Sequence, residues 1–199
     1  MRGTADVIDA LVGIAPGSPL DAIRARRPEA RSQAQATYHA LFAPEAPGAV
    51  SVQERFAIAR FVAGLHGDAA VAAFYAEGLA ASAAPAALGE AVDAASADAP
   101  AQGPYGHYPA GPLSRENVIG PTYRVNAKTR AALGLRLAAA FEHAHVLVFH
   151  PRDATPDALK ALLDAGWTTT DVVTLSQIVA FLSFQIRVVV GLRTLAAHP

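Results

Sequence analysis

The residues best suited to chemistry lie in the stretch "GLHGDAAVAAFY", residues 64–75, where His66, Asp68 and Tyr75 gather at a break between two helical patterns. Imidazole, carboxylate and phenol side chains can together transfer protons or bind a polar ligand. The same residues also suit a structural arrangement, in which Asp68 caps the second helix and Tyr75 makes a buried hydrogen bond. Because caps are far more common than sites, we favour the structural interpretation and keep a chemical site as the alternative.

A second cluster, Glu142, His143 and His145, lies near the end of a long helical pattern. Glu142 and His145 are three residues apart and share a helix face, which is the spacing found in di-iron helical bundles. Such a centre needs a second copy of the motif and two further glutamates on other helices, and the sequence contains no second copy. His143 and His145 point to different faces. We therefore predict no metal site and no cofactor.

A third group, Tyr105, His107 and Tyr108, lies in a Gly- and Pro-rich segment predicted to be a loop over residues 100–125. A loop of this length in a compact domain is either functional or packed against a neighbour. Its aromatic side chains could form a lid over a pocket or an arm that packs on another subunit. The sequence leaves both possibilities open.

Arg187 lies, with Gln185, in the most apolar helical segment of the chain. If it is buried there, it needs an acidic partner, and Glu54 and Glu142 are the candidates. A structural ion pair or a subunit contact is the favoured role, ahead of catalysis.

These side chains are positioned by a chain that has a helical pattern almost throughout. Its start signals include the capping box "SVQE" at Ser51–Glu54, Asp68, and Thr155 followed by Pro156. The apolar periodicity predicts helices over 4–11, 18–27, 28–42, 51–65, 68–80, part of 81–99, 126–149, 155–166 and 170–195. The last of these is apolar on nearly every side, which predicts that it is buried within the subunit or between subunits. No strand pattern competes, so the predicted fold class is all-α.

Composition bounds the function. The 199 residues suit one domain, 1–199, of two related helical halves, about 1–99 and 126–199, joined by the loop at about 100–125. Hydrophobic residues make up 52% of the chain and charged residues 17%, which indicates a buried oligomer interface or simply a high alanine content. A net charge of −1 with no basic stripe argues against nucleic-acid binding. The chain has no cysteine, which excludes disulfides and thiol catalysis by its own residues.

The N-terminus carries no secretory pattern. The apolar C-terminal segment is interrupted by Gln177, Ser183, Gln185 and Arg187, so we expect it to fall short of a membrane span. A soluble cytoplasmic protein is the resulting expectation.

Two segments carry a resemblance to a known family. Residues 51–75, "SVQERFAIARFVAGLHGDAAVAAFY", and residues 162–192, "LLDAGWTTTDVVTLSQIVAFLSFQIRVVVGL", resemble the AhpD-like (alkylhydroperoxidase D-like) and carboxymuconolactone decarboxylase superfamily. Gly166, Phe184 and Arg187 stand at matching places in the second segment. Together the two segments cover 56 of the 199 residues, somewhat more than a quarter of the chain. The resemblance implies an AhpD-like helical bundle that assembles as a dimer, trimer or hexamer.

The family's thiol chemistry uses a Cys-x-x-Cys-x-x-x-His motif at a helix start and a relay glutamate before it. Carried over without gaps, the two cysteine positions fall on Asp68 and Val71, the histidine position on Tyr75 and the glutamate position on Phe56. None of these residues is the family's chemical group. The resemblance therefore implies the remnant of a peroxidase site, in which Asp68 caps a helix and apolar side chains fill the former pocket.

Two functional hypotheses follow from the resemblance. In the first, the chain has lost thiol peroxidase activity and acts as a scaffold, a partner of an active paralogue or a ligand-binding oligomer. In the second, it is a cysteine-independent enzyme of the carboxymuconolactone-decarboxylase type acting on a small carboxylate or lactone, with His66, Glu54, Arg187 and His107 as candidate groups. The first predicts side chains filling the space around Phe56, Val71 and Tyr75. The second predicts a pocket where titratable groups converge.

Overall fold

The computed structural model describes residues 6–198, so the predicted helix start at Thr4 lies outside the described residues. Over that range the chain forms nine α-helices and two short 3₁₀ helices with no β-strand, which confirms the all-α prediction. The α-helices are α1 (Val7–Val12), α2 (Pro19–Ala25), α3 (Pro28–Phe42), α4 (Val52–Leu65), α5 (Ala69–Ala81), α6 (Ala86–Ala97), α7 (Ala127–Phe149), α8 (Pro156–Asp164) and α9 (Thr169–Ala197). The 3₁₀ helices are η1 (Pro112–Glu116) and η2 (Pro151–Asp153).

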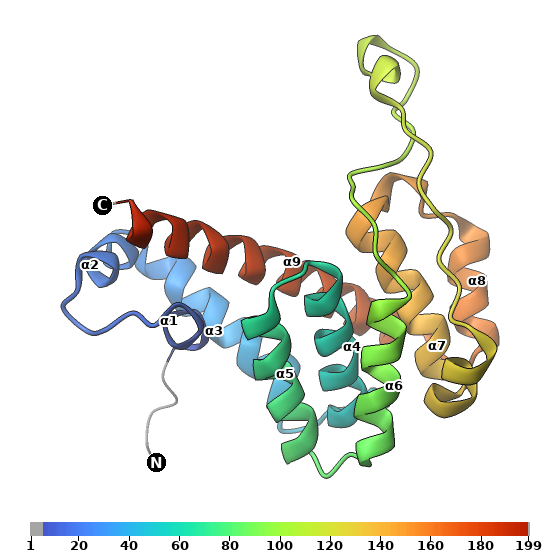
Figure 1. The fold of residues 1–199 in the computed structure, drawn as a ribbon, viewed down its shortest axis with the longest axis horizontal. Coiled ribbons are helices and arrows are strands. Elements are labelled where there is room, and N and C mark those ends of the chain that lie inside the picture. Colours follow the sequence, from blue (N-terminus) through green and yellow to red (C-terminus); the bar gives the residue numbers. More distant parts are fainter. Residues whose placement is uncertain (1–5, 199) are drawn as a thin grey trace.

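Helix α4 lies at the centre of the molecule and packs against α5, α6, α7 and α9 (Figure 1). Its residues Ala57–Ala59 and Phe61–Ala63 are fully buried. Alanine on several sides of one helix lets the neighbouring helices approach closely, and each buried aromatic ring removes a large apolar area from water. The ring of Phe61 stacks on that of Phe141 in α7 with centroids 4.2 Å apart. The core is therefore arranged around the helix that precedes the predicted break.

The predicted helix starts are confirmed by hydrogen bonds. Ser51 and Glu54 form a reciprocal capping box, Asp68 accepts from the amide of Val71, and Thr155 accepts from the amide of Ala158. Each such cap satisfies an amide that the helix leaves unpaired and stabilises the helix by about 1 kcal/mol.

Helix α9 differs from its prediction. One side packs on the core through residues such as Leu175, Ile178 and Leu182. The opposite side exposes Val173 and Phe184, among other large apolar residues, so α9 is not buried all round within the subunit. Burial of that side between subunits stays a prediction.

Both α7 and α9 are long and apolar enough, by length and composition, to cross a membrane. Core helices of soluble proteins pass the same test, and about half of the apolar window of each helix is buried against the rest of the chain. The expectation that α9 falls short of a span, which depends on its polar residues, stays a prediction.

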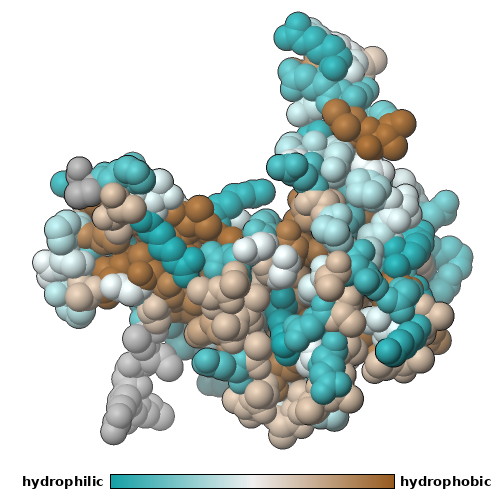
Figure 2. Space-filling model, in the orientation of Figure 1, coloured by the Kyte–Doolittle hydropathy of each residue, from teal (hydrophilic) through white to brown (hydrophobic). Residues whose placement is uncertain are grey.

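Residues 100–125 form an arm that projects away from the helices (Figure 1). A single bridge between Gly106 and Val118 joins its outgoing and returning segments, and η1 lies at its tip. The arm is anchored at its base, where the amide of Tyr105 donates to the carbonyl of Phe149 at 2.7 Å. Apolar side chains are exposed on the arm (Figure 2). The returning segment runs back along α7, which places it over the residues described next.

Candidate functional site

Phe56, Val71 and Tyr75, three of the positions onto which the resemblance carries a thiol site, lie in the core. Val71 and Tyr75 are fully buried and Phe56 nearly so. The ring of Phe42, on α3, lies 5.2 Å from that of Phe56 and 5.0 Å from that of Tyr75, measured between centroids. On the other side, Phe56 packs so tightly on Gly78 that a Cβ there would overlap its ring. The predicted filling of this space is confirmed.

Tyr75 makes the buried hydrogen bond that the structural interpretation requires. Its hydroxyl donates to Oε1 of Gln185, on α9, at 2.7 Å. Burial raises the pKa of this phenol well above 10, so it stays protonated and acts as a donor. Gln185 is itself fully buried, and its Nε2 has no hydrogen-bond partner among residues 6–198. The pair links α5 to α9 through the core.

Asp68 is a cap and also an anchor. Besides accepting from Val71, its carboxylate receives Nη1 of Arg193 at 2.8 Å, and Nη2 of the same guanidinium donates to the carbonyl of Leu11. These contacts tie the start of α5 to α9 and to the end of α1. The structural interpretation of Asp68 is therefore confirmed.

Glu54 has a structural role at the other end of α4. It closes the capping box with Ser51, and its Oε1 accepts from Nε of Arg136 at 2.7 Å. The Arg136 guanidinium also contacts Asp171 at 3.3 Å and lies 4.1 Å from the centroid of the Trp167 ring. Arg136 thus joins the starts of α4 and α9 to α7.

The expectation that Arg187 is buried beside Glu54 or Glu142 is wrong. Arg187 is exposed, because it lies on the outward side of α9. The two glutamates have other partners: Glu54 pairs with Arg136, and Glu142 pairs with Arg130. Arg187 makes no ion pair among the described residues.

The four candidate enzyme groups are not brought together within the chain. His66 is near Arg187, since burial and the charge of Arg187 both lower the pKa of the imidazole, and Nε2 of His66 lies 3.4 Å from Oγ of Ser183. Glu54 is at the opposite end of α4, about 18 Å away by helical rise. His107 is on the arm, where its backbone amide and Nδ1 contact Asp153 at 3.1 and 3.2 Å.

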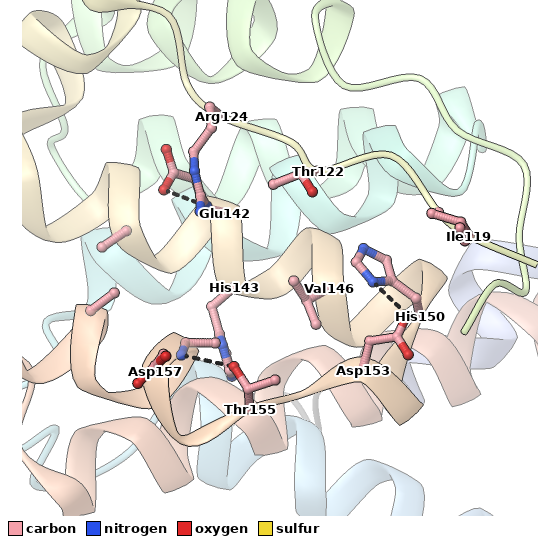
Figure 3. A pocket seen from close by; sticks show the side chains of 14 residues that line it. Ile119, Thr122, Arg124, Glu142, His143, Val146, His150, Asp153, Thr155 and Asp157 are labelled. Atoms are coloured by element: carbon pink, nitrogen blue, oxygen red, sulfur yellow. Dashed lines mark hydrogen bonds and ion pairs between the residues drawn. The ribbon is translucent and has the colours of Figure 1, made fainter. Parts of the chain in front are cut away.

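Titratable groups converge instead in a pocket of about 420 Å³ beneath the returning segment of the arm. The arm forms one wall, the last turns of α7 a second, and η2 with the start of α8 a third (Figure 3). The polar side chains that line it are Thr122, Arg124, Glu142, His143, His150, Asp153, Thr155 and Asp157. Ile119 and Val146 add apolar surface. The volume is within the range of small-molecule sites.

His143 is the central residue of this pocket. It is 5% exposed, and its ring extends from α7 toward Thr155 and Asp157 (Figure 3). Burial lowers its pKa from 6.5, so the imidazole is neutral at pH 7. Its Nδ1 is buried and has no hydrogen-bond partner among residues 6–198. An unpaired buried nitrogen of this kind costs about 1–3 kcal/mol in desolvation.

Most charges around the pocket already have partners. Glu142 accepts from Nη1 of Arg124 at 3.3 Å, from Arg130 and from the amide of Val125. The carboxylate of Asp153 faces His107, and its Oδ2 lies 3.5 Å from Nδ1 of His150. The arrangement can bind a small polar molecule or accept a proton from one through His143.

No group of three His, Asp or Glu side chains within residues 6–198 is placed to hold a metal ion. Glu142 and His145, the pair with di-iron spacing, contact different parts of the molecule. Glu142 faces arginines, whereas His145 packs between the rings of Tyr123 and Phe149 at centroid distances of 5.1 and 4.8 Å.

Sequence reasoning missed the pocket. The sequence indicates His143 only as a possible metal ligand and assigns no role to His150 or Asp157. Three histidines within eight residues, "HAHVLVFH", were the available signal. What the sequence did not show is that the arm returns over this end of α7 and encloses it. The sequence allows the loop to be a lid or an arm, and in the structure its returning segment forms one wall of the pocket.

No family model, no curated protein and no solved structure matches the chain.

Proposed function

We propose that the chain is an AhpD-like protein of the carboxymuconolactone decarboxylase superfamily that has lost the thiol site and acts as a cytoplasmic, ligand-binding homo-oligomer. Its support is the α4–turn–α5 arrangement with Asp68 at the start of α5, where the family places its first cysteine. The former pocket is filled by Phe56, Val71 and Tyr75. An active paralogue remains a further candidate partner.

The ligand site of this proposal is the pocket beneath the arm, and one observation carries it: a neutral, buried histidine lines a cavity of ligand size, and its Nδ1 has no partner among residues 6–198. A buried polar atom without a partner is costly. A residue that carries such a desolvation cost is expected at a position where its function, and not its contribution to stability, is what requires it. The decarboxylase-type alternative is not favoured, because its four groups do not converge within the chain.

Replacing His143 with phenylalanine separates binding from stability. Phenylalanine removes the unpaired nitrogen while keeping a ring of similar shape, so we expect the free energy of unfolding to rise by about 0.5–1.5 kcal/mol. In saturation-transfer NMR with benzylamine, benzyl alcohol and benzoate as probes, at least one probe should bind the wild type and lose binding to this variant. Chemical denaturation measures the stability of the same sample.

His198→Phe is the matched control, because His198 is exposed at the end of α9, away from the pocket. It should leave both binding and stability unchanged. A wild type that binds none of the three probes, or a His143→Phe variant that binds them as well, contradicts the proposed site.

The oligomer of this proposal uses the arm. Leu113, Val118 and Ile119 are the arm's exposed large apolar residues, and Ile119 is 82% exposed. Apolar side chains clustered on a projecting segment mark a protein contact. Light scattering at micromolar concentration should give a mass above 20.6 kDa for the wild type. Ile119→Asp should lower that mass, whereas Leu135→Asp, on the exposed side of α7, should not. A wild type that is monomeric at this concentration would contradict the proposed homo-oligomer.

A further inference from the structure

We propose that the pocket beneath the arm takes a small organic cation, a primary ammonium group carried on a compact apolar body. The proposal rests on ligand binding at this site and names the class of ligand. The class of ligand follows from the charged side chains that line the pocket: most of them already have partners, and one carboxylate has none.

The pocket's single arginine is not free to bind an anion. Arg124 points its guanidinium at Glu142, as Figure 3 shows, and Glu142 also receives Arg130. These three side chains therefore carry no unpaired negative charge. Asp153 is likewise occupied by contacts from His107 and His150.

Asp157 is the carboxylate that remains. It lines the pocket from the first turn of α8 and makes no hydrogen bond or ion pair with any of residues 6–198. Its negative charge is favoured at a helix start. An ammonium group beside it would supply an opposite charge, whereas a carboxylate ligand would meet the unpaired charge of Asp157 and, in Arg124, a guanidinium that is already paired with Glu142.

The remaining contacts suit the rest of such a molecule. A neutral imidazole always has one bare nitrogen that accepts a hydrogen bond, and His143 lines the same pocket as Asp157. The hydroxyl of Thr155 already accepts from the amide of Ala158, so its proton is free to be donated. Ile119, Val146 and the alanines of α7 and α8 provide apolar walls for a hydrocarbon body. Charge, hydrogen bonding and apolar contact are thus satisfied by one ligand class.

Benzylamine, benzyl alcohol and benzoate test the class, because they share a ring and differ in charge. Titrations at pH 7 and low ionic strength, followed by the ¹³C–¹H signals of the His143 ring, should give the tightest binding for benzylamine. We expect its Kd to be about fivefold to tenfold lower than that of benzyl alcohol, as for a charge-assisted contact at a partly open site. Benzoate should produce no shift.

Two variants assign the effect to one carboxylate. Asp157→Asn should weaken benzylamine binding by about fivefold to tenfold and leave benzyl alcohol unchanged. Asp164→Asn, at the exposed far end of the same helix, is the matched control and should change neither.

The outcomes separate this inference from the function it rests on. Equal binding of the three probes, or tightest binding of benzoate, overturns the cation class while ligand binding stands. Benzylamine binding that survives Asp157→Asn unchanged overturns the placement of the ammonium group. If no probe shifts the His143 signals, both the class and the ligand-binding pocket are refuted.

Discussion

Gly78→Ala will destabilise the protein by about 2–3 kcal/mol, although glycine to alanine in a helix interior normally stabilises by about 1 kcal/mol. Gly78 lies within α5, and a Cβ at this position would overlap the ring of Phe56 on α4. The ring cannot move aside easily, because Phe42 and Tyr75 pack on it. The added methyl group must therefore separate α4 from α5 or displace Phe56 from its rotamer.

Gly191→Ala is the matched control. Gly191 lies within α9, and no atom lies within 4 Å of a Cβ built there. We expect this variant to gain about 0.5–1 kcal/mol, so that the two substitutions shift the midpoint of urea unfolding in opposite directions. Two shifts of the same sign would show that the contact between α4 and α5 is looser than described, and that space remains around Phe56.

Acid will destabilise the protein between pH 7 and about pH 4.5, and His145 will account for about 2 kcal/mol of the loss. Burial, with a smaller contribution from the charge of His150, lowers the pKa of His145 from 6.5 to about 4. The unfolded chain therefore takes up a proton at higher pH than the folded protein does. The contribution of His145 is complete above pH 6.5 and is lost as the pH falls toward 4.

His145→Phe should remove most of this dependence. The ring would still pack between Tyr123 and Phe149, which contact the imidazole in the wild type. Free energies of unfolding from urea titrations at several pH values measure the slope. His198→Phe, which alters an exposed ring, should retain the wild-type slope. A His145→Phe variant as acid-sensitive as the wild type would show that other groups cause the loss.

The helices and their starts could be predicted because they depend on residues close in sequence. Ser51 with Glu54, Asp68 and Thr155 form the caps that their types and spacing indicate. The filled space around Phe56 and Val71 also followed from residue types alone, since phenylalanine and valine leave no polar group to solvate. Both predictions needed only local chemistry.

Features that depend on distant partners were missed. The apolar pattern of α9 suggested a buried Arg187, yet Arg187 is exposed and Gln185, two residues earlier, is fully buried. Because α9 has apolar residues on all sides, its sequence does not indicate which side packs on the core and which side is exposed. Gly134 interrupts the helical conformation inside α7 with a φ of 77°, which the continuous apolar pattern did not indicate.

Predicting the pocket requires knowing the path of the arm. The sequence shows His143 and His150 directly. The residues that surround them in the pocket belong to segments 119–124 and 153–158, which approach the two histidines only in the folded chain. A histidine has the same appearance in sequence whether it packs in a core or lines a cavity. Nδ1 of His143 and Nδ1 of His145 both lack a partner among residues 6–198, but His143 lines the pocket and His145 does not, which only the structure shows.

Ile119 belongs to two surfaces at once: it lines the pocket and is also the most exposed apolar residue of the arm. An occupant of the cavity and a neighbouring protomer on the arm would therefore touch the same short segment. Coupling free energies between binding equilibria are reciprocal. If the bound ligand changes the association constant of the protomers by some factor, association must change the ligand affinity by the same factor. The measured ligand affinity would then depend on protein concentration.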